Sequence, residues 1–169
     1  MMDDAQIRHI PTSSRRFWVW LLVLFVIVIG LTMLKDWWLT GEKPNILFYL
    51  VVPPASMLGA VLCMFWVVKV SNQPISFLEI LAIIISVNLV MQGLEIVLKL
   101  IYYRLWEYPG WLYFVIVIPA GFLLGVYGLV RWSRVKVGKA AVLMAVGLAG
   151  ELVTAALVSS IFGLSTLGS

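Results

Sequence analysis

Four polar side chains within one long apolar segment are the residues whose types and spacing could do chemistry. They are Asn88, Gln92, Glu95 and Lys99, spaced four, three and four apart. At about 100° per residue they fall within roughly 60° of one another on one helix face. An ammonium group, a carboxylate and two amides on one face could hold a proton, an ion or a small polar molecule.

A further acidic residue, Glu151, lies near the middle of the last apolar segment. A charge at the centre of a bilayer costs about 2.5 to 3.5 kcal/mol, so it needs a partner, a proton or access to water. Asn88 would lie at nearly the same depth, with Gln92 about one turn further out. We therefore expect Glu151 to be protonated, or hydrogen-bonded to Asn88 or Gln92 across a helix interface.

Lys99 is expected to pair with Glu95 rather than with Glu151. Its depth differs from that of Glu151 by about 15 Å of helical rise, whereas Glu95 lies one turn before it in the favoured Glu-to-Lys order. The amine of Lys99 would reach toward the outer headgroups. The polar stripe would then consist of a local ion pair near the outer surface and two amides deeper in the membrane.

Several chemistries lack the residues they require. His9 is the only histidine and Cys63 the only cysteine, so no histidine-based zinc site, bis-histidine haem or intrachain disulfide is expected. The only aspartates are Asp3, Asp4 and Asp36, which gives no membrane-level pair for aspartyl proteolysis. We expect no cofactor and no metal, and an enzyme is the less favoured interpretation.

The composition indicates a polytopic membrane protein. Of the 169 residues, 63% are hydrophobic and 12% charged, and the mean hydropathy is +1.06. The apolar runs predict an all-α bundle of five transmembrane helices in a single domain, residues 15–169, after a cytoplasmic tail, residues 1–14. The helices are predicted at about residues 17–34, 46–70, 77–103, 111–132 and 140–163.

Local signals mark the boundaries and irregularities of these helices. The first helix should end before the charges at 35 and 36, which leaves residues 35–45 as a short external loop. Pro53 and Pro54 each remove a backbone donor and predict a kink or break in the second helix. Ser76 with Glu79 three residues later fits a capping box at the start of the third.

Small residues in the fourth helix predict close helix contact. Gly121 and Gly125 are four apart, and Gly128 lies on a nearby face. Such spacing lets helix backbones approach in lipid.

Basic residues set the expected orientation. The loop after the fourth helix holds Arg131, Arg134, Lys136 and Lys139 without an acidic residue, so it should be cytoplasmic. This places the N-terminus inside and the C-terminus outside a cytoplasmic (inner) membrane. Because the basic residues flank apolar runs, we expect the lipid bilayer and no nucleic acid as a partner.

In layout the chain resembles two membrane-protein families. Its size and a late helix, with residues 111–114 followed by residues 119–121, resemble the small membrane subunit of tripartite substrate-binding-protein-dependent carriers, although the acidic pair after the first helix is absent. Asn88 and the helix opening at Trp111 resemble lipoprotein signal peptidase, but its catalytic aspartates have no counterpart at Met91 or Pro119. Neither resemblance covers a diagnostic motif, so we assign no family.

Two functions follow from these features. The favoured one is an accessory or scaffolding subunit of a membrane complex, associating through its glycine-rich and polar faces with other subunits or with further copies of itself. The alternative is a transporter or channel component that moves a proton, an ion or a small polar substrate. Its path would be lined by Asn88, Gln92, Glu95 and Glu151.

Overall fold

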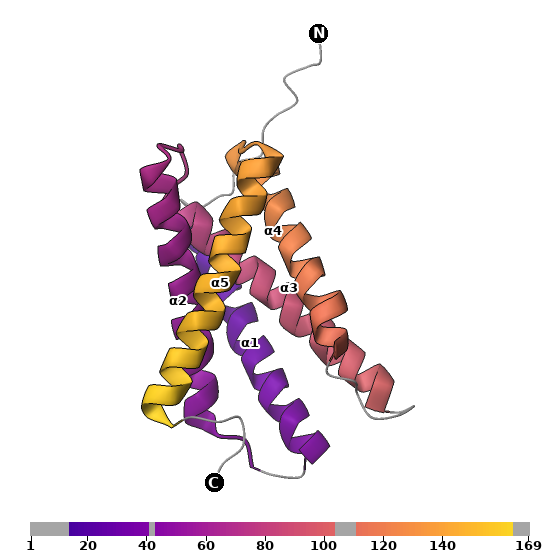
Figure 1. The fold of residues 1–169 in the computed structure, drawn as a ribbon. Helices are drawn as coiled ribbons and strands as arrows, with labels where there is room; N and C mark the ends of the chain where they lie inside the picture. The colour runs from indigo at the N-terminus through magenta and orange to yellow at the C-terminus, as the bar shows by residue number, and fades with distance from the viewer. Residues whose placement is uncertain (1–13, 41–42, 104–110, 164–169) are drawn as a thin grey trace.

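The computed structural model describes residues 14–40, 43–103 and 111–163, and the elements in these ranges are helical. Five of the helices are long and apolar enough to span a membrane, which confirms the predicted all-α bundle. In chain order the elements are α1 (Arg15–Thr40), α2 (Ile46–Val70), α3 (Phe77–Tyr103), a π-helical segment η1 (Tyr113–Val117), α4 (Ile118–Ser133) and α5 (Val137–Phe162) (Figure 1).

Successive helices run in opposite directions, so α1 begins and α5 ends at opposite ends of the bundle (Figure 1). We call the end where α1 begins the basic end, because the exposed basic side chains Arg15, Arg16, Lys69, Arg131, Arg134, Lys136 and Lys139 belong to its helix termini and turns. We call the other end, where α2 begins and α3 ends, the cavity end, after a cavity that lies between α1, α2 and α3 in that half. That the basic end faces the cytoplasm stays a prediction.

Helices α2 and α5 make the most extensive contact of any two helices among the described residues. A Cβ atom on Gly59 would lie 3.1 Å from the Gly150 carbonyl oxygen, and one on Gly150 would lie 3.1 Å from the Gly59 carbonyl oxygen. Only glycine lets the two backbones approach this closely. Helix α5 packs chiefly on α2 and also on α4, and the expected polar link between the third and fifth helices is limited to Asn88 and Glu151.

The three glycines of α4 each lie against a different side chain. A side chain on Gly121 would overlap Met91 of α3, and one on Gly125 would overlap Met144 of α5. At Gly128 a Cβ atom would lie 3.1 Å from the ring of Trp132 in the same helix. Two faces of α4 are therefore packed against two helices by large, flexible methionines.

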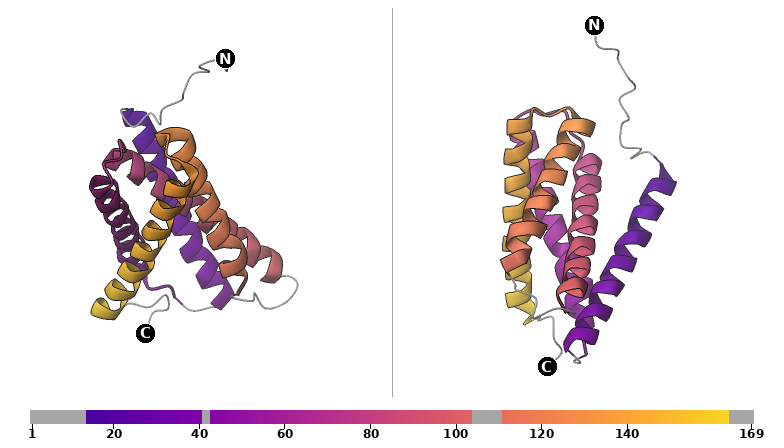
Figure 2. Two further views of the ribbon diagram at one scale, coloured as in Figure 1. Left: turned by 45° about the horizontal axis from the view of Figure 1, so that its top comes forward. Right: turned by 90° about the vertical axis from the view of Figure 1, so that its right-hand side faces the viewer.

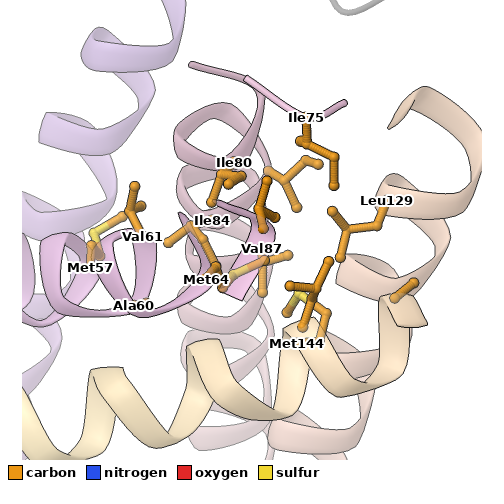
Figure 3. Close-up of a cluster of buried hydrophobic side chains, with 14 of the residues drawn as sticks. Met57, Ala60, Val61, Met64, Ile75, Ile80, Ile84, Val87, Leu129 and Met144 are labelled. Carbon is orange, nitrogen blue, oxygen red and sulfur yellow. The ribbon is translucent and has the colours of Figure 1, made fainter. Parts of the chain in front are cut away.

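The buried core lies in the half of the bundle nearer the basic end. Side chains from four helices meet there with no exposed surface, among them Met64, Ile80, Leu129 and Met144 (Figure 3). Toward the cavity end burial ends early in α3 and α5, since no residue of α3 after Met91 and no described residue of α5 after Gly150 is buried.

Helix α1 is the least enclosed part of the bundle. Leu21 is its only residue with a described side chain that is buried, and α1 contacts α3 and, less, α2. In the right-hand view of Figure 2, α1 slants away from the other helices toward the basic end and approaches them toward the cavity end.

One of the boundary predictions is wrong. The first helix does not end at about residue 34 but continues through Asp36 to Thr40, because Asp36 finds a partner on α2 and need not reach solvent. Helix α2 continues without a break through Pro53 and Pro54, and a kink there stays a prediction. The Ser56 hydroxyl donates to the Pro53 carbonyl at 2.9 Å.

Other local predictions agree with the structure or differ slightly. The capping box is confirmed: the Ser76 backbone amide donates to Glu79 at 2.9 Å, and the Glu79 amide donates to the Ser76 hydroxyl at 3.2 Å. Helix α5 begins at Val137, three residues before the predicted start. The predicted tail lies outside the described residues except for Ser14.

Candidate functional site: a polar cavity between three helices

A cavity of about 220 Å³ lies between α1, α2 and α3 in the half nearer the cavity end. One part of its wall is hydrocarbon and aromatic, including Phe25, Phe48 and Met57. The other part is polar and is contributed by all three helices: Thr32 and Asp36 from α1, Tyr49 from α2, and Asn88, Gln92, Glu95 and Lys99 from α3.

Helix α3 contributes its entire polar stripe to this cavity. The Lys99 Nζ atom lies 2.5 Å from Glu95 Oε1, the ion pair that their spacing predicts. The two side chains are only 24% and 13% exposed. Lys99 thus lines the same cavity as Asn88 and Gln92, with the ion pair nearer the C-terminal end of α3 and the two amides deeper along it.

Helix α1 meets α3 through a hydroxyl. Thr32 Oγ1 donates to the Val28 carbonyl at 2.9 Å and also lies 3.3 Å from Gln92 Oε1. Gln92 therefore contacts α1. Asn88 is rotated from Gln92 by about 40° around α3 and lies near Glu151 of α5.

Helices α1 and α2 meet through Asp36 and Tyr49. The Tyr49 hydroxyl donates to Asp36 Oδ2, and Tyr49 itself is 3% exposed. Asn45 caps α2 by accepting the backbone N–H of Phe48 at 3.3 Å, which fixes the first turn of the helix and with it the position of Tyr49.

Sequence reasoning missed Thr32, Asp36 and Tyr49 as site residues. A signal was present, because Thr32 and Asp36 are one turn apart and share a helix face once α1 is allowed to continue past residue 34. Tyr49 carried no comparable signal, since its role depends on the packing of α1 against α2.

The deep end of the polar stripe leads to Glu151. Asn88 is 9% exposed, its Nδ2 atom donates to the Ile84 carbonyl at 3.2 Å, and its side chain lies near the carboxyl group of Glu151 on α5. An amide nitrogen has two protons, so Asn88 can serve both acceptors. Polar groups therefore continue from Lys99 to Glu151, although Glu151 does not line the cavity itself.

Apolar packing closes the bundle beyond Glu151. One turn earlier on α5, a Cβ atom on Gly147 would lie 2.7 Å from the sulfur of Met64 and 3.8 Å from Ile84. Met64 has no exposed surface and Ile84 is 2% exposed. Because Gly147, Met64 and Ile84 are apolar, they do not extend the row of polar groups from Glu151 toward the basic end.

The cavity presents one ammonium group, two carboxylates, a phenol, a hydroxyl and two amides. Among the residues that the structure describes, no three His, Cys, Asp or Glu side chains gather as they would around a metal ion. No known protein family, curated protein or solved structure matches this chain. Function is therefore inferred from the cavity and from the helices that form it.

Proposed function

We propose that this protein binds a small polar solute in the cavity between α1, α2 and α3 and acts as a component of a membrane transport system. The observation that supports this is the enclosure of an ion pair, a second carboxylate, a phenol and two amides by helices that are otherwise apolar. Ionisable groups at membrane depth are costly and are retained chiefly where they serve a function.

The size of the cavity limits the solute. An apolar cavity of about 150 Å³ accommodates benzene, so a volume of 220 Å³ suits a molecule of roughly nine non-hydrogen atoms. This favours a metabolite-sized solute over a peptide or a whole lipid.

Access in this arrangement is from one end. The charged residues of the cavity, Asp36, Glu95 and Lys99, lie in the C-terminal parts of α1 and α3, while the half nearer the basic end is filled by the buried core. Passage across the bundle would require that core to open, and α1, the least enclosed wall, is the element that can move with the smallest loss of packing.

Thiol labelling tests this access. In a Cys63→Ser background, we expect Gln92→Cys to react with at least one of two membrane-impermeant methanethiosulfonates, one cationic and one anionic, added to one side of sealed vesicles. The matched control, Ile84→Cys, lies two turns closer to the basic end on α3 and should not react, because Ile84 is 2% exposed. An unreactive Gln92→Cys, or equal reaction at both positions, would contradict a one-sided polar cavity.

A second candidate function is an accessory or scaffolding subunit, and the openness of α1 favours it. Apart from Leu21, the described side chains of α1 are at least partly exposed, which leaves a long helix face for lipid or for a partner helix. The mass of the protein in mild detergent tests this function. A stable monomer without a co-purifying protein would contradict it.

Glu151→Gln separates the two functions. A neutral amide still hydrogen-bonds to Asn88, so a scaffold should assemble normally with this variant. If transport is coupled to a proton on Glu151, the variant should assemble but lose proton-driven solute uptake.

A further inference from the structure

We propose that the solute is a small organic ammonium ion, an inference that rests on the cavity being a solute-binding site. The described lining residues include two carboxylates, Asp36 and Glu95, and one ammonium group, Lys99, so their formal charges sum to one net negative charge. This sum does not depend on which carboxylate Lys99 contacts. A bound monovalent cation brings the cavity to neutrality.

The surroundings strengthen this preference. Charges interact more strongly in a poorly solvated site than in water, so a net negative cavity between apolar helices attracts a cation and repels an anion. Binding an anion would raise the net charge to two negatives, and Lys99, the one lysine among the described lining residues, already lies 2.5 Å from Glu95.

Both carboxylates line the cavity together with Tyr49. The hydroxyl of Tyr49 donates to Asp36, and Glu95 lines the same cavity from α3. An ammonium group near this phenol can therefore interact with both acidic residues. It has two or three N–H donors, which match carboxylate and phenol oxygens as acceptors.

The remaining wall favours an organic cation over a metal ion. Phe25, Phe48 and Met57 line the cavity opposite the polar groups. Aromatic faces attract ammonium groups and also accommodate hydrocarbon, whereas a hard metal cation seeks oxygen ligands on every side.

Three probes of nearly equal size and different charge test the inference: benzylammonium, benzyl alcohol and benzoate. The protein is held in phosphatidylcholine nanodiscs, and calorimetric heats from empty nanodiscs are subtracted to remove partitioning into lipid. We expect saturable binding of benzylammonium at least ten-fold tighter than that of benzyl alcohol, with no saturable binding of benzoate.

Variants that change the charge of the cavity test whether its residues cause the preference for a cation. Asp36→Asn should weaken benzylammonium binding at least ten-fold, and Lys99→Gln should tighten it, because the variants remove a negative and a positive charge respectively. Glu79→Gln is the matched control, since that carboxylate caps α3 near the basic end and should not affect binding. If Asp36→Asn does not fold, the effect of Lys99→Gln on benzylammonium binding still tests the inference: tighter binding supports it, and unchanged or weaker binding contradicts it.

The outcomes separate this inference from the proposed function. Equal binding of benzylammonium and benzyl alcohol, or preferential binding of benzoate, would overturn the ammonium assignment while leaving a solute-binding cavity. Binding of no probe, together with an unreactive Gln92→Cys, would overturn both.

Discussion

The two halves of this bundle differ in which helices meet and in what lies between them. Toward the basic end, α2, α3, α4 and α5 surround side chains with no exposed surface, such as Met64 and Ile80 (Figure 3). Toward the cavity end, α2 and α3 instead share polar groups with α1 around a cavity of about 220 Å³. The change occurs along α3 within one turn, between Asn88 and Gln92, where the burial of the helix ends.

The difference separates the packing that stabilises the fold from the packing that leaves a polar cavity. In lipid, apolar surface gains little from burial, so the half nearer the basic end depends on close van der Waals contact at Gly59, Gly125 and Gly150. The cavity half carries polar groups that hydrogen-bond or pair with one another, and no residue at the ends of α3 and α5 in that half is buried among those that the structure describes. A closely packed half therefore adjoins a half that contains a cavity.

The largest expected effect is the loss of Met64, which has no exposed surface and packs against Gly147. Met64→Ala should lower the free energy of unfolding by about 2 to 5 kcal/mol, because it leaves a void in the core. The matched control is Leu62→Ala on the same helix, where the side chain is 52% exposed and should cost far less. Unfolding by dodecyl sulfate in mixed micelles measures both. Equal costs would show that the two faces of α2 are packed alike.

A smaller effect should distinguish glycines in the two halves. Gly150→Ala places a Cβ atom 2.7 Å from the Cys63 sulfur and 3.1 Å from the Gly59 carbonyl, which should cost about 1 to 3 kcal/mol of unfolding free energy. Gly93→Ala has nothing within 4 Å and should be neutral or stabilise by up to about 1 kcal/mol, since alanine favours the helix. The same micelle titration gives both values. If Gly150→Ala were as stable as the parent protein, close contact between α2 and α5 would not support the bundle.

The features that could be predicted from the sequence are the local ones. Each helix follows from an apolar run long enough to cross a bilayer. The Glu95–Lys99 pair and the Ser76–Glu79 capping box each join residues within one turn, so spacing alone predicts them.

The features that could not be predicted depend on which helices are neighbours. Depth along α3 suggested that either Asn88 or Gln92 could meet Glu151, but depth does not say which side of α3 faces α5. Gln92 is rotated by about 40° from Asn88 and meets Thr32 of α1 instead. Asp36 looked like a loop charge because its partner, Tyr49, lies on another helix. Such long-range pairing leaves no periodic signal in a single sequence.

The smallest expected effect on stability, and the sharpest contrast between the halves, concerns the ion pair of the cavity. Replacing both Glu95 and Lys99 with Met should leave the unfolding free energy unchanged or raise it by about 1 kcal/mol, because desolvation offsets most of the attraction in an enclosed pair. The gain is small since both side chains keep some exposure, 13% and 24%.

The same double variant should nevertheless abolish solute binding, because the methionines fill the cavity and remove one of its two carboxylates. Benzylammonium calorimetry and the micelle titration, performed on one preparation, measure the two effects together. A stable variant without binding would mean that the ion pair is kept for the solute. A marked loss of stability would instead mean that the pair holds the helix, and the cavity half would then be built on the same principle as the core.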